Sequence, residues 1–256
     1  MKLNKIYNED AITFMKRMPK NKVSLICTSP PYNVGIEYDS HNDSMKWKDY
    51  VNWCRTWLSL FKRVLKPDGR FAINVPLEIG LKSNANKRVS PFSTFLNLIE
   101  EVGLNYSACP VWSDNNITKL TAWGSWMSAS SPYIYCPYEV VIIGYNKVWK
   151  KEKKGTSTIS KSDFIKGCSG VWNVQPETKG LTVANFPVKL PKLCIELLTY
   201  KNDIVCDPFS GSATTAIAAI QTGRRFIGSE ISKKYWKIGN RRINEEIEDE
   251  KLRIFK

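Results

Sequence analysis

The feature that most constrains the fold of this chain is a repeated alternation of short apolar runs with amphipathic helical segments. Residues 23–28, 70–76 and 203–207 are apolar runs of strand length, which predict buried strands. Apolar side chains recur at helical spacing over 45–66 and 186–199. Repeated strand–helix units predict an α/β fold, in which a mostly parallel, twisted sheet carries helices on both faces.

The alternation is interrupted once. Residues 138–146 form a continuous β-branched run, typical of a strand that is buried on both faces. Residues 147–170 are polar, rich in lysine and without periodicity, and the alternation resumes near Phe186. We therefore predict a domain built from residues 1–146 and 186–256, with residues 147–185 as an insert.

Charge restricts the class of partner. The chain of 256 residues has 38 Lys+Arg against 24 Asp+Glu, a net charge of +14, which favours nucleic acid or an anionic membrane. No apolar run reaches the ~18 residues that a membrane span needs, and acidic residues interrupt the N-terminal segment early, unlike in a signal peptide. Nucleic acid is the expected partner.

The cysteines and the histidine indicate a protein without a metal site. None of the seven cysteines forms a C-x-x-C pair, and His41 is the single histidine, so a structural zinc site lacks a ligand set. Unpaired cysteines in apolar surroundings predict reduced thiols and a cytoplasmic location. We assign no role to His41.

A strand–turn–helix unit in the last third of the chain predicts a nucleoside cofactor. An apolar strand ends at Asp207, the turn "PFSGS" follows, and the next strand ends at Glu230, where a carboxylate can accept hydrogen bonds from ribose hydroxyls. The turn has one glycine and matches neither the P-loop nor the dinucleotide pattern, so no pyrophosphate cradle is evident. S-adenosylmethionine, a nucleoside without phosphate, suits this turn best.

The stretch "SPPY" follows another strand. Prolines fix the backbone, the Ser29 hydroxyl and the Pro30 carbonyl offer two hydrogen-bond acceptors, and Tyr32 offers a flat face. Together they can hold a planar heterocycle that carries an amino group. A turn that merely ends the strand is the alternative, and the neighbouring cofactor turn favours the binding function.

With these motifs in this order, the chain resembles the beta class of amino-group DNA methyltransferases. In that family an Asp/Asn/Ser-Pro-Pro-Tyr/Phe motif precedes the F-x-G-x-G cofactor motif, a circularly permuted order, with a target-recognition region between them. The segments 60–75, 137–147 and 186–199 also resemble family motifs. Ala213 departs from the family, since it replaces the last glycine of the cofactor motif.

The resemblance implies a Rossmann-like, S-adenosylmethionine-dependent methyltransferase fold. It implies a catalytic part in 1–146, a target-recognition insert in 147–185 and a cofactor-binding part in 186–256. The catalytic residues are then Ser29, Pro30, Pro31 and Tyr32. The cofactor-binding residues are Asp10, expected at the adenine, with Thr28, Asp207, Pro208, Phe209, Ser210, Gly211, Ser212 and Glu230.

The expected reaction is methylation of an exocyclic amine in double-stranded DNA, on a base flipped out of the duplex. In the family, Ser-Pro-Pro-Tyr accompanies cytosine N4 methylation, and adenine N6 methylation is the alternative. A DNA-binding regulator that has lost catalysis is a second alternative, and the two intact motifs argue against it because such a protein needs neither. The resemblance further suggests a restriction-modification system with a cognate endonuclease, and a second copy of the chain as partner.

We also predict where three tryptophans, the 121–133 stretch and the lysines of 147–166 lie in the fold. Trp47, Trp53 and Trp57 are expected to pack in the core. The non-periodic stretch 121–133 fits either an active-site rim or a core-packed connection, and the lysines of 147–166 are expected to face DNA.

Overall fold

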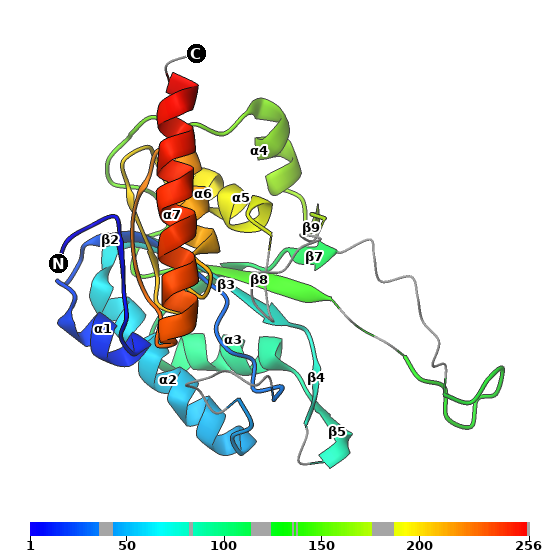
Figure 1. Cartoon of the computed structure of the whole chain (residues 1–256). Helices are drawn as coiled ribbons and strands as arrows, with labels where there is room; N and C mark the ends of the chain where they lie inside the picture. The colour runs from blue at the N-terminus through cyan, green and yellow to red at the C-terminus, as the bar shows by residue number, and fades with distance from the viewer. Residues whose placement is uncertain are drawn as a thin grey trace.

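The computed structural model describes residues 1–35, 43–81, 84–113, 124–134, 136, 138–175 and 187–254; His41 and part of the 121–133 stretch lie outside them. Its helices are α1 Ala11–Arg17, α2 Trp47–Val64, α3 Pro91–Glu101, α4 Lys161–Gly167, α5 Lys189–Leu198, α6 Thr214–Gln221 and α7 Lys233–Ile254 (Figure 1). Its strands are β1 Lys5–Tyr7, β2 Val23–Thr28, β3 Leu65–Pro76, β4 Ile79–Leu81, β5 Asn84–Val89, β6 Asn105–Ala108, β7 Val111–Ser113, β8 Glu139–Tyr145, β9 Val171–Asn173, β10 Ile204–Asp207 and β11 Arg225–Ser229.

The main sheet has the order β1-β11-β10-β2-β3-β8-β7-β9, with β6 paired to β8. The five neighbouring strands β1, β11, β10, β2 and β3 are parallel, and β8 runs antiparallel to β3. The predicted α/β fold with a mostly parallel sheet is confirmed. The carboxyl ends of β2, β10 and β11 therefore meet at one edge, which we call the carboxyl edge.

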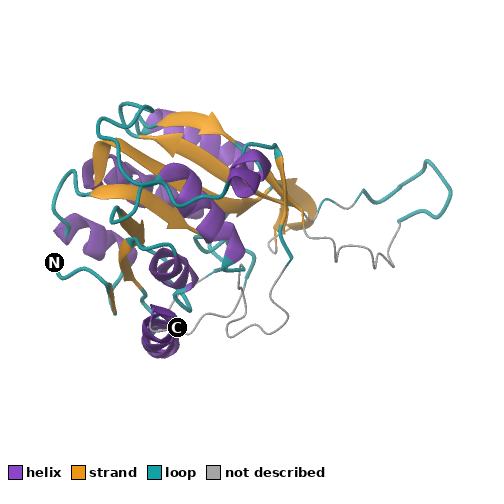
Figure 2. Cartoon of the chain, turned by 90° about the horizontal axis from the view of Figure 1, so that it is seen from above, coloured by secondary structure: helices purple, strands orange, loops and turns teal. Residues whose placement is uncertain are grey.

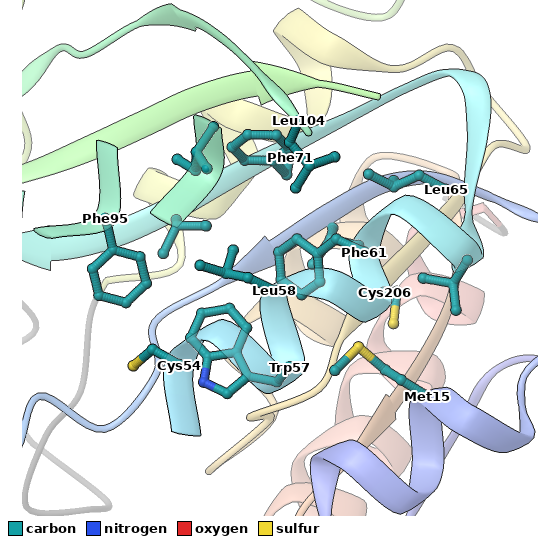
Figure 3. Packing of buried hydrophobic residues seen from close by; sticks show 14 of the residues in the cluster. Met15, Cys54, Trp57, Leu58, Phe61, Leu65, Phe71, Phe95, Leu104 and Cys206 are labelled. Atoms are coloured by element: carbon teal, nitrogen blue, oxygen red, sulfur yellow. The ribbon is translucent and has the colours of Figure 1, made fainter. Parts of the chain in front are cut away.

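Helices cover both faces of the sheet (Figures 1 and 2). Strand side chains alternate between two cores: Ile26 packs with α1, α2 and α3, whereas Leu25 and Cys27 pack with α5 and α6. Trp57, which is fully buried, lies in the first core among Phe61, Phe95 and Leu58 (Figure 3). The core position predicted for this tryptophan is confirmed, and Trp47 and Trp53 pack against the same cluster while partly exposed.

The predicted elements differ from the structure in two places. The segment "KPDG" lies inside β3 as an irregularity, because the pairing with β2 jumps from Leu65 to Arg70. Residues 147–170, expected to have no regular structure, contain α4, whose first turn is capped by the Ser160 hydroxyl. No helix within the described ranges is long and apolar enough to span a membrane.

The lysine-rich segment after β8 follows the amino ends of the parallel strands. Arg70 of β3, which pairs with Tyr145 at the end of antiparallel β8, donates to the Trp149 carbonyl (2.7 Å) and lies over the Trp149 ring. Lys151 lies 4.0 Å from Asp203, just before β10, and Lys201 donates its backbone N–H to the Thr156 carbonyl. This start of the predicted insert thus lies on the side of the sheet opposite the carboxyl edge.

Candidate active site

One hydrogen bond joins the two sequence motifs. Strands β2 and β10 are parallel neighbours, with Cys206 opposite Ile26, so the chain segments that leave them start side by side. The Thr28 hydroxyl donates to Asp207 Oδ1 at 2.6 Å, and both residues are buried. The SPPY loop and the cofactor turn are thereby held together at the carboxyl edge.

The SPPY loop is held by a hydrogen bond from a buried tyrosine of α2. The Tyr50 hydroxyl of α2 donates to the Pro31 carbonyl at 2.9 Å. Within the described part of the chain, no donor contacts the Pro30 carbonyl. That carbonyl keeps its lone pairs for a ligand.

The residues after the loop are clamped by Asp43. Its carboxylate accepts from the backbone N–H groups of Asn33 (2.8 Å) and Val34 (3.0 Å), and its carbonyl accepts from Gly35. Asn33, which has a left-handed backbone (φ 60°), exchanges two hydrogen bonds with the Met45 backbone. Such a clamp preorganises the loop and limits its rearrangement on binding.

The Tyr32 hydroxyl lies in a buried polar cluster of three further side chains. It lies 2.6 Å from Ser29 Oγ, donates to Glu139 Oε2 (3.0 Å) and accepts from Asn74 Nδ2 (2.9 Å). Asn74 also donates to the same Glu139 oxygen. Burial raises the pKa of Glu139 above its usual range, although both hydrogen bonds oppose the shift.

The cofactor turn has the backbone geometry that its glycine motif requires. Gly211 has a positive φ (49°), and no heavy atom lies within 4 Å of a Cβ placed there, so a ligand can approach the backbone closely. Ala213 also has a positive φ (70°), which explains why the family prefers glycine at that position. The predicted tight turn is present, and Ala213 is accommodated with backbone strain.

Glu230 closes the turn at the end of β11. Its two carboxylate oxygens accept from the backbone N–H groups of Gly211 (2.8 Å) and Ser232 (2.7 Å). A carboxylate offers about four lone-pair positions, so Glu230 can also accept from ribose hydroxyls. An open glycine beside an acceptor at the strand end fits S-adenosylmethionine.

The remaining predicted cofactor residues divide into two groups. Asp10 follows β1 at the same edge, because the Glu9 N–H donates to the Glu230 carbonyl (3.1 Å) and the Glu230 N–H donates to the Tyr7 carbonyl (2.9 Å). The Asp10 side chain caps α1 by accepting from the backbone N–H groups of Ile12 and Thr13. The side chains of the second group hold the turn in place. The Thr28 hydroxyl donates to the Asp207 carboxylate, and the Ser210 hydroxyl donates to the Asp207 carbonyl. The Ser212 hydroxyl accepts from Arg242, and the Phe209 ring packs edge-on against Trp57.

The structure adds residues that sequence reasoning missed: Asp43, Tyr50, Asn74 and Glu139. Glu139 and Asn74 belong to strands that were predicted, but no local pattern shows that their side chains meet Tyr32. The 121–133 stretch is also clarified where it is described. Trp126 and Met127 are 69% and 89% exposed, on an arm that projects beyond β7 and β8 (Figures 1 and 2), so the core-packed alternative is wrong for these residues.

Most of the chain matches the model of a known protein family. Residues 23–241 match the model of the DNA methylase family, which contains the N6 and N4 methyltransferases. The chain belongs to this family. Its members transfer methyl groups from S-adenosylmethionine to DNA in restriction-modification systems.

Individual relatives agree with this family. The chain is 38% identical to the type II methyltransferase M.MjaVI of Methanocaldococcus jannaschii over 162 residues, which are 63% of this chain and 81% of the relative. It superposes on the DNA modification methylase TTHA0409 of Thermus thermophilus, solved with S-adenosylmethionine, with a TM-score of 0.74 and 21% identity over 94% and 93% of the two chains. The cytosine-N4-specific PvuII methyltransferase gives a TM-score of 0.72 and 21% identity over 96% and 92%.

The buried carboxyl group of Asp207 predicts a pH dependence of stability. Burial raises its pKa from 3.8 to about 6, against hydrogen bonds that lower it. The folded state then holds the extra proton between about pH 4 and 6, so the free energy of unfolding falls as pH rises through this window. Asp207→Asn, which keeps an acceptor for Thr28, should gain roughly 2–3 kcal/mol over the wild type at pH 7 and little at pH 4.

Urea unfolding at both pH values measures this difference. Asp249→Asn, at an exposed position of α7, is the matched control and should gain nothing at either pH. An equal gain for Asp207→Asn at pH 4 and pH 7 would contradict the assignment.

Proposed function

We propose that this DNA methyltransferase methylates the exocyclic N4 amine of cytosine, on a base flipped out of a double-stranded site. The observation that carries the proposal is the pair of acceptors at the carboxyl edge: the Ser29 hydroxyl, held by Tyr32, and the Pro30 carbonyl, which no described donor contacts. Both follow the strand next to the cofactor turn. The amine of a flipped base can reach them beside the bound cofactor.

The reaction needs little chemistry from the protein beyond position and polarity. S-adenosylmethionine, when bound, supplies an electrophilic methyl group. The Ser29 hydroxyl oxygen and the Pro30 carbonyl accept hydrogen bonds from the two N–H groups of the amine, which draws the nitrogen towards tetrahedral geometry and localises its lone pair. Their rigid loop aligns that lone pair for in-line attack. Tyr32 stacks on the base while its hydroxyl stays in the polar cluster.

Glu230 and Asp10 complete the proposed cofactor site. We assign Glu230, which accepts from the Gly211 N–H, to the ribose hydroxyls. We assign Asp10 to the adenine, since it follows Glu9, whose N–H donates to the Glu230 carbonyl. The side chains of Thr28, Ser210 and Phe209 act by holding the turn. Pro208 and Ser212 line it as part of the same backbone.

Adenine N6 methylation is the alternative for the same geometry, because an adenine amine carries the same two protons. Cytosine is favoured by the neutral Ser29 in place of the aspartate that accompanies adenine methylation in the family. A regulator without activity is disfavoured because both motifs are intact, and the hydrogen bond from Thr28 to Asp207 holds the Ser29 loop next to the turn that Glu230 closes.

Removal of Glu230 tests the cofactor assignment. Glu230→Ala should weaken S-adenosylmethionine binding roughly 10- to 100-fold, because a charged acceptor to hydroxyl groups is worth about 1.5–3 kcal/mol. Isothermal titration calorimetry measures the change. Glu248→Ala, an exposed glutamate of α7, is the control, and equal affinity in both variants would overturn the role of Glu230.

Removal of the Ser29 hydroxyl tests the catalytic assignment. Ser29→Ala should lower kcat roughly 10²- to 10³-fold, as for the loss of one transition-state hydrogen bond, while cofactor affinity stays unchanged. Ser59→Ala, at an exposed position of α2, is the control. Mass spectrometry of nucleosides from treated DNA should show 4-methylcytosine; only 6-methyladenine would overturn the choice of base, and a fully active Ser29→Ala would remove Ser29 from the mechanism.

We also propose where DNA lies. A flipped base must enter at the carboxyl edge, so the duplex faces the amino end of α2, the β4–β5 hairpin and the projecting arm of 124–134. Arg88 of β5 lies over Tyr133 of this arm (5.3 Å). The end of the predicted target-recognition insert fits this face, because β9 pairs with β7 and leads towards the carboxyl edge. Its lysine-rich start lies on the opposite side.

Salt dependence of DNA binding tests this orientation. Replacement of Lys46, Lys48 and Arg88 by glutamine should reduce the slope of log K against log salt by roughly 0.9 for each lost phosphate contact. Replacement of three exposed lysines on the opposite side, Lys150, Lys153 and Lys154, should leave the slope unchanged. The reverse pattern in fluorescence anisotropy would contradict this orientation and indicate that DNA binds at the amino ends of the parallel strands.

Two further partners remain proposals. A cognate endonuclease follows from the restriction-modification family, and a homodimer from the initial resemblance, which light scattering of the free protein tests. Because the substrate is DNA, we propose a cytoplasmic location.

A further inference from the structure

The polar cluster behind the SPPY loop has a defined direction of hydrogen bonding. Asn74 and Tyr32 both donate to the same oxygen of Glu139, the arrangement of an ionised carboxylate. The Tyr32 hydroxyl has a single proton, and the hydrogen bond to Glu139 uses it. The 2.6 Å contact between Tyr32 and Ser29 must then have Ser29 as donor.

The direction of these hydrogen bonds determines which side of the Ser29 hydroxyl faces the base. With its proton directed at Tyr32, the Ser29 oxygen presents its lone pairs away from the cluster, where they can accept from an amine. Glu139 therefore sets the polarity of Ser29 through Tyr32. The carboxylate does so from β8, a strand that neither sequence motif contains.

The reaction also releases a proton that needs an acceptor. Attack of the amine nitrogen on the methyl carbon breaks the carbon–sulfur bond of the cofactor and leaves a positive charge on the nitrogen. Loss of one N–H proton restores a neutral methylated amine. Water has limited access to the cluster, since Asn74 is 3% exposed and its side-chain oxygen is buried with no partner among the described residues.

We propose that Glu139 is a positioning residue that receives this proton through Ser29 and Tyr32. The amine proton passes to the Ser29 oxygen, the original Ser29 proton passes to Tyr32, and the original Tyr32 proton passes to Glu139. The nitrogen loses one proton, Glu139 gains one, and the two hydroxyl groups are unchanged. The inference rests on the proposed methylation of an exocyclic amine and holds for either base.

The surroundings of Glu139 suit a proton acceptor. Burial raises its pKa, so the carboxylate binds a proton more readily than an exposed one. Tyr32 is the titratable side chain that contacts it among the described residues; Asn74, Pro76 and Trp112, which face it from β3 and β7, do not titrate. A proton on Glu139 before the reaction would remove the acceptor, so turnover should fall as pH falls through its raised pKa.

Two variants test the route. Glu139→Gln keeps the size and a carbonyl acceptor for Tyr32 but cannot take up the proton, so kcat should fall roughly 10²-fold or more. The acid limb of the kcat profile should disappear in this variant while the KM for S-adenosylmethionine stays unchanged. Tyr32→Phe keeps the stacking face and removes the hydroxyl that relays the proton in this chain, so its kcat should fall similarly.

The controls separate this proposal from the others. The assay measures the transfer of labelled methyl groups to DNA, so its result does not depend on which base is modified. The activity of the wild type in the same assay tests the proposed function itself. Infrared difference spectra of wild type minus Glu139→Gln should show one carboxyl group that titrates above the ordinary glutamate range. Glu101→Gln, an exposed glutamate of α3, should leave kcat and the acid limb unchanged. Near wild-type kcat with an intact acid limb in Glu139→Gln, or a fully active Tyr32→Phe, would overturn the proposal.

Discussion

The hydrogen bond from Thr28 to Asp207 is the contact on which the active site depends, because it joins segments that are 179 positions apart in the chain. It follows from the parallel pairing of β2 and β10, which brings both strand ends to one edge. Burial of the Asp207 carboxyl group costs stability, as its raised pKa shows. Hydrogen bonds from Thr28 and the Phe209 backbone offset part of this cost and orient the turn.

The rest of the site is rigid for a related reason. The SPPY loop has few donors of its own, so neighbouring elements supply the contacts that hold it: Tyr50 on the Pro31 carbonyl and Asp43 on the backbone after Tyr32. A loop held in this way loses little conformational entropy when a base binds. The polar cluster with Glu139 then adds chemistry to a loop that is already positioned.

Sequence reasoning predicted the fold well where local patterns are strong. The helical periodicity of α2 and the strand–turn–helix unit around Asp207 both appear in the structure. The lysine-rich start of the 147–185 insert, which was predicted to face DNA, packs at the amino ends of the strands, away from the edge where we propose that the duplex lies. Net charge carries no information about where on a folded surface the charges lie. The short helix α4 was missed because two turns give too few residues for a periodicity.

The sequence by itself determined the two motifs, their order and hence the family, because residues adjacent in the chain create the SPPY loop and the glycine turn. It also determined the α/β alternation, since strand and helix periods are local properties. Only the tertiary structure decided that Glu139 and Asn74 meet Tyr32, and that the arm rather than the lysines lies near the carboxyl edge. Those contacts depend on strand order and register: β8 pairs antiparallel with β3, which places Glu139 opposite Pro76 at the carboxyl end of β3. No local pattern encodes such a pairing between distant segments.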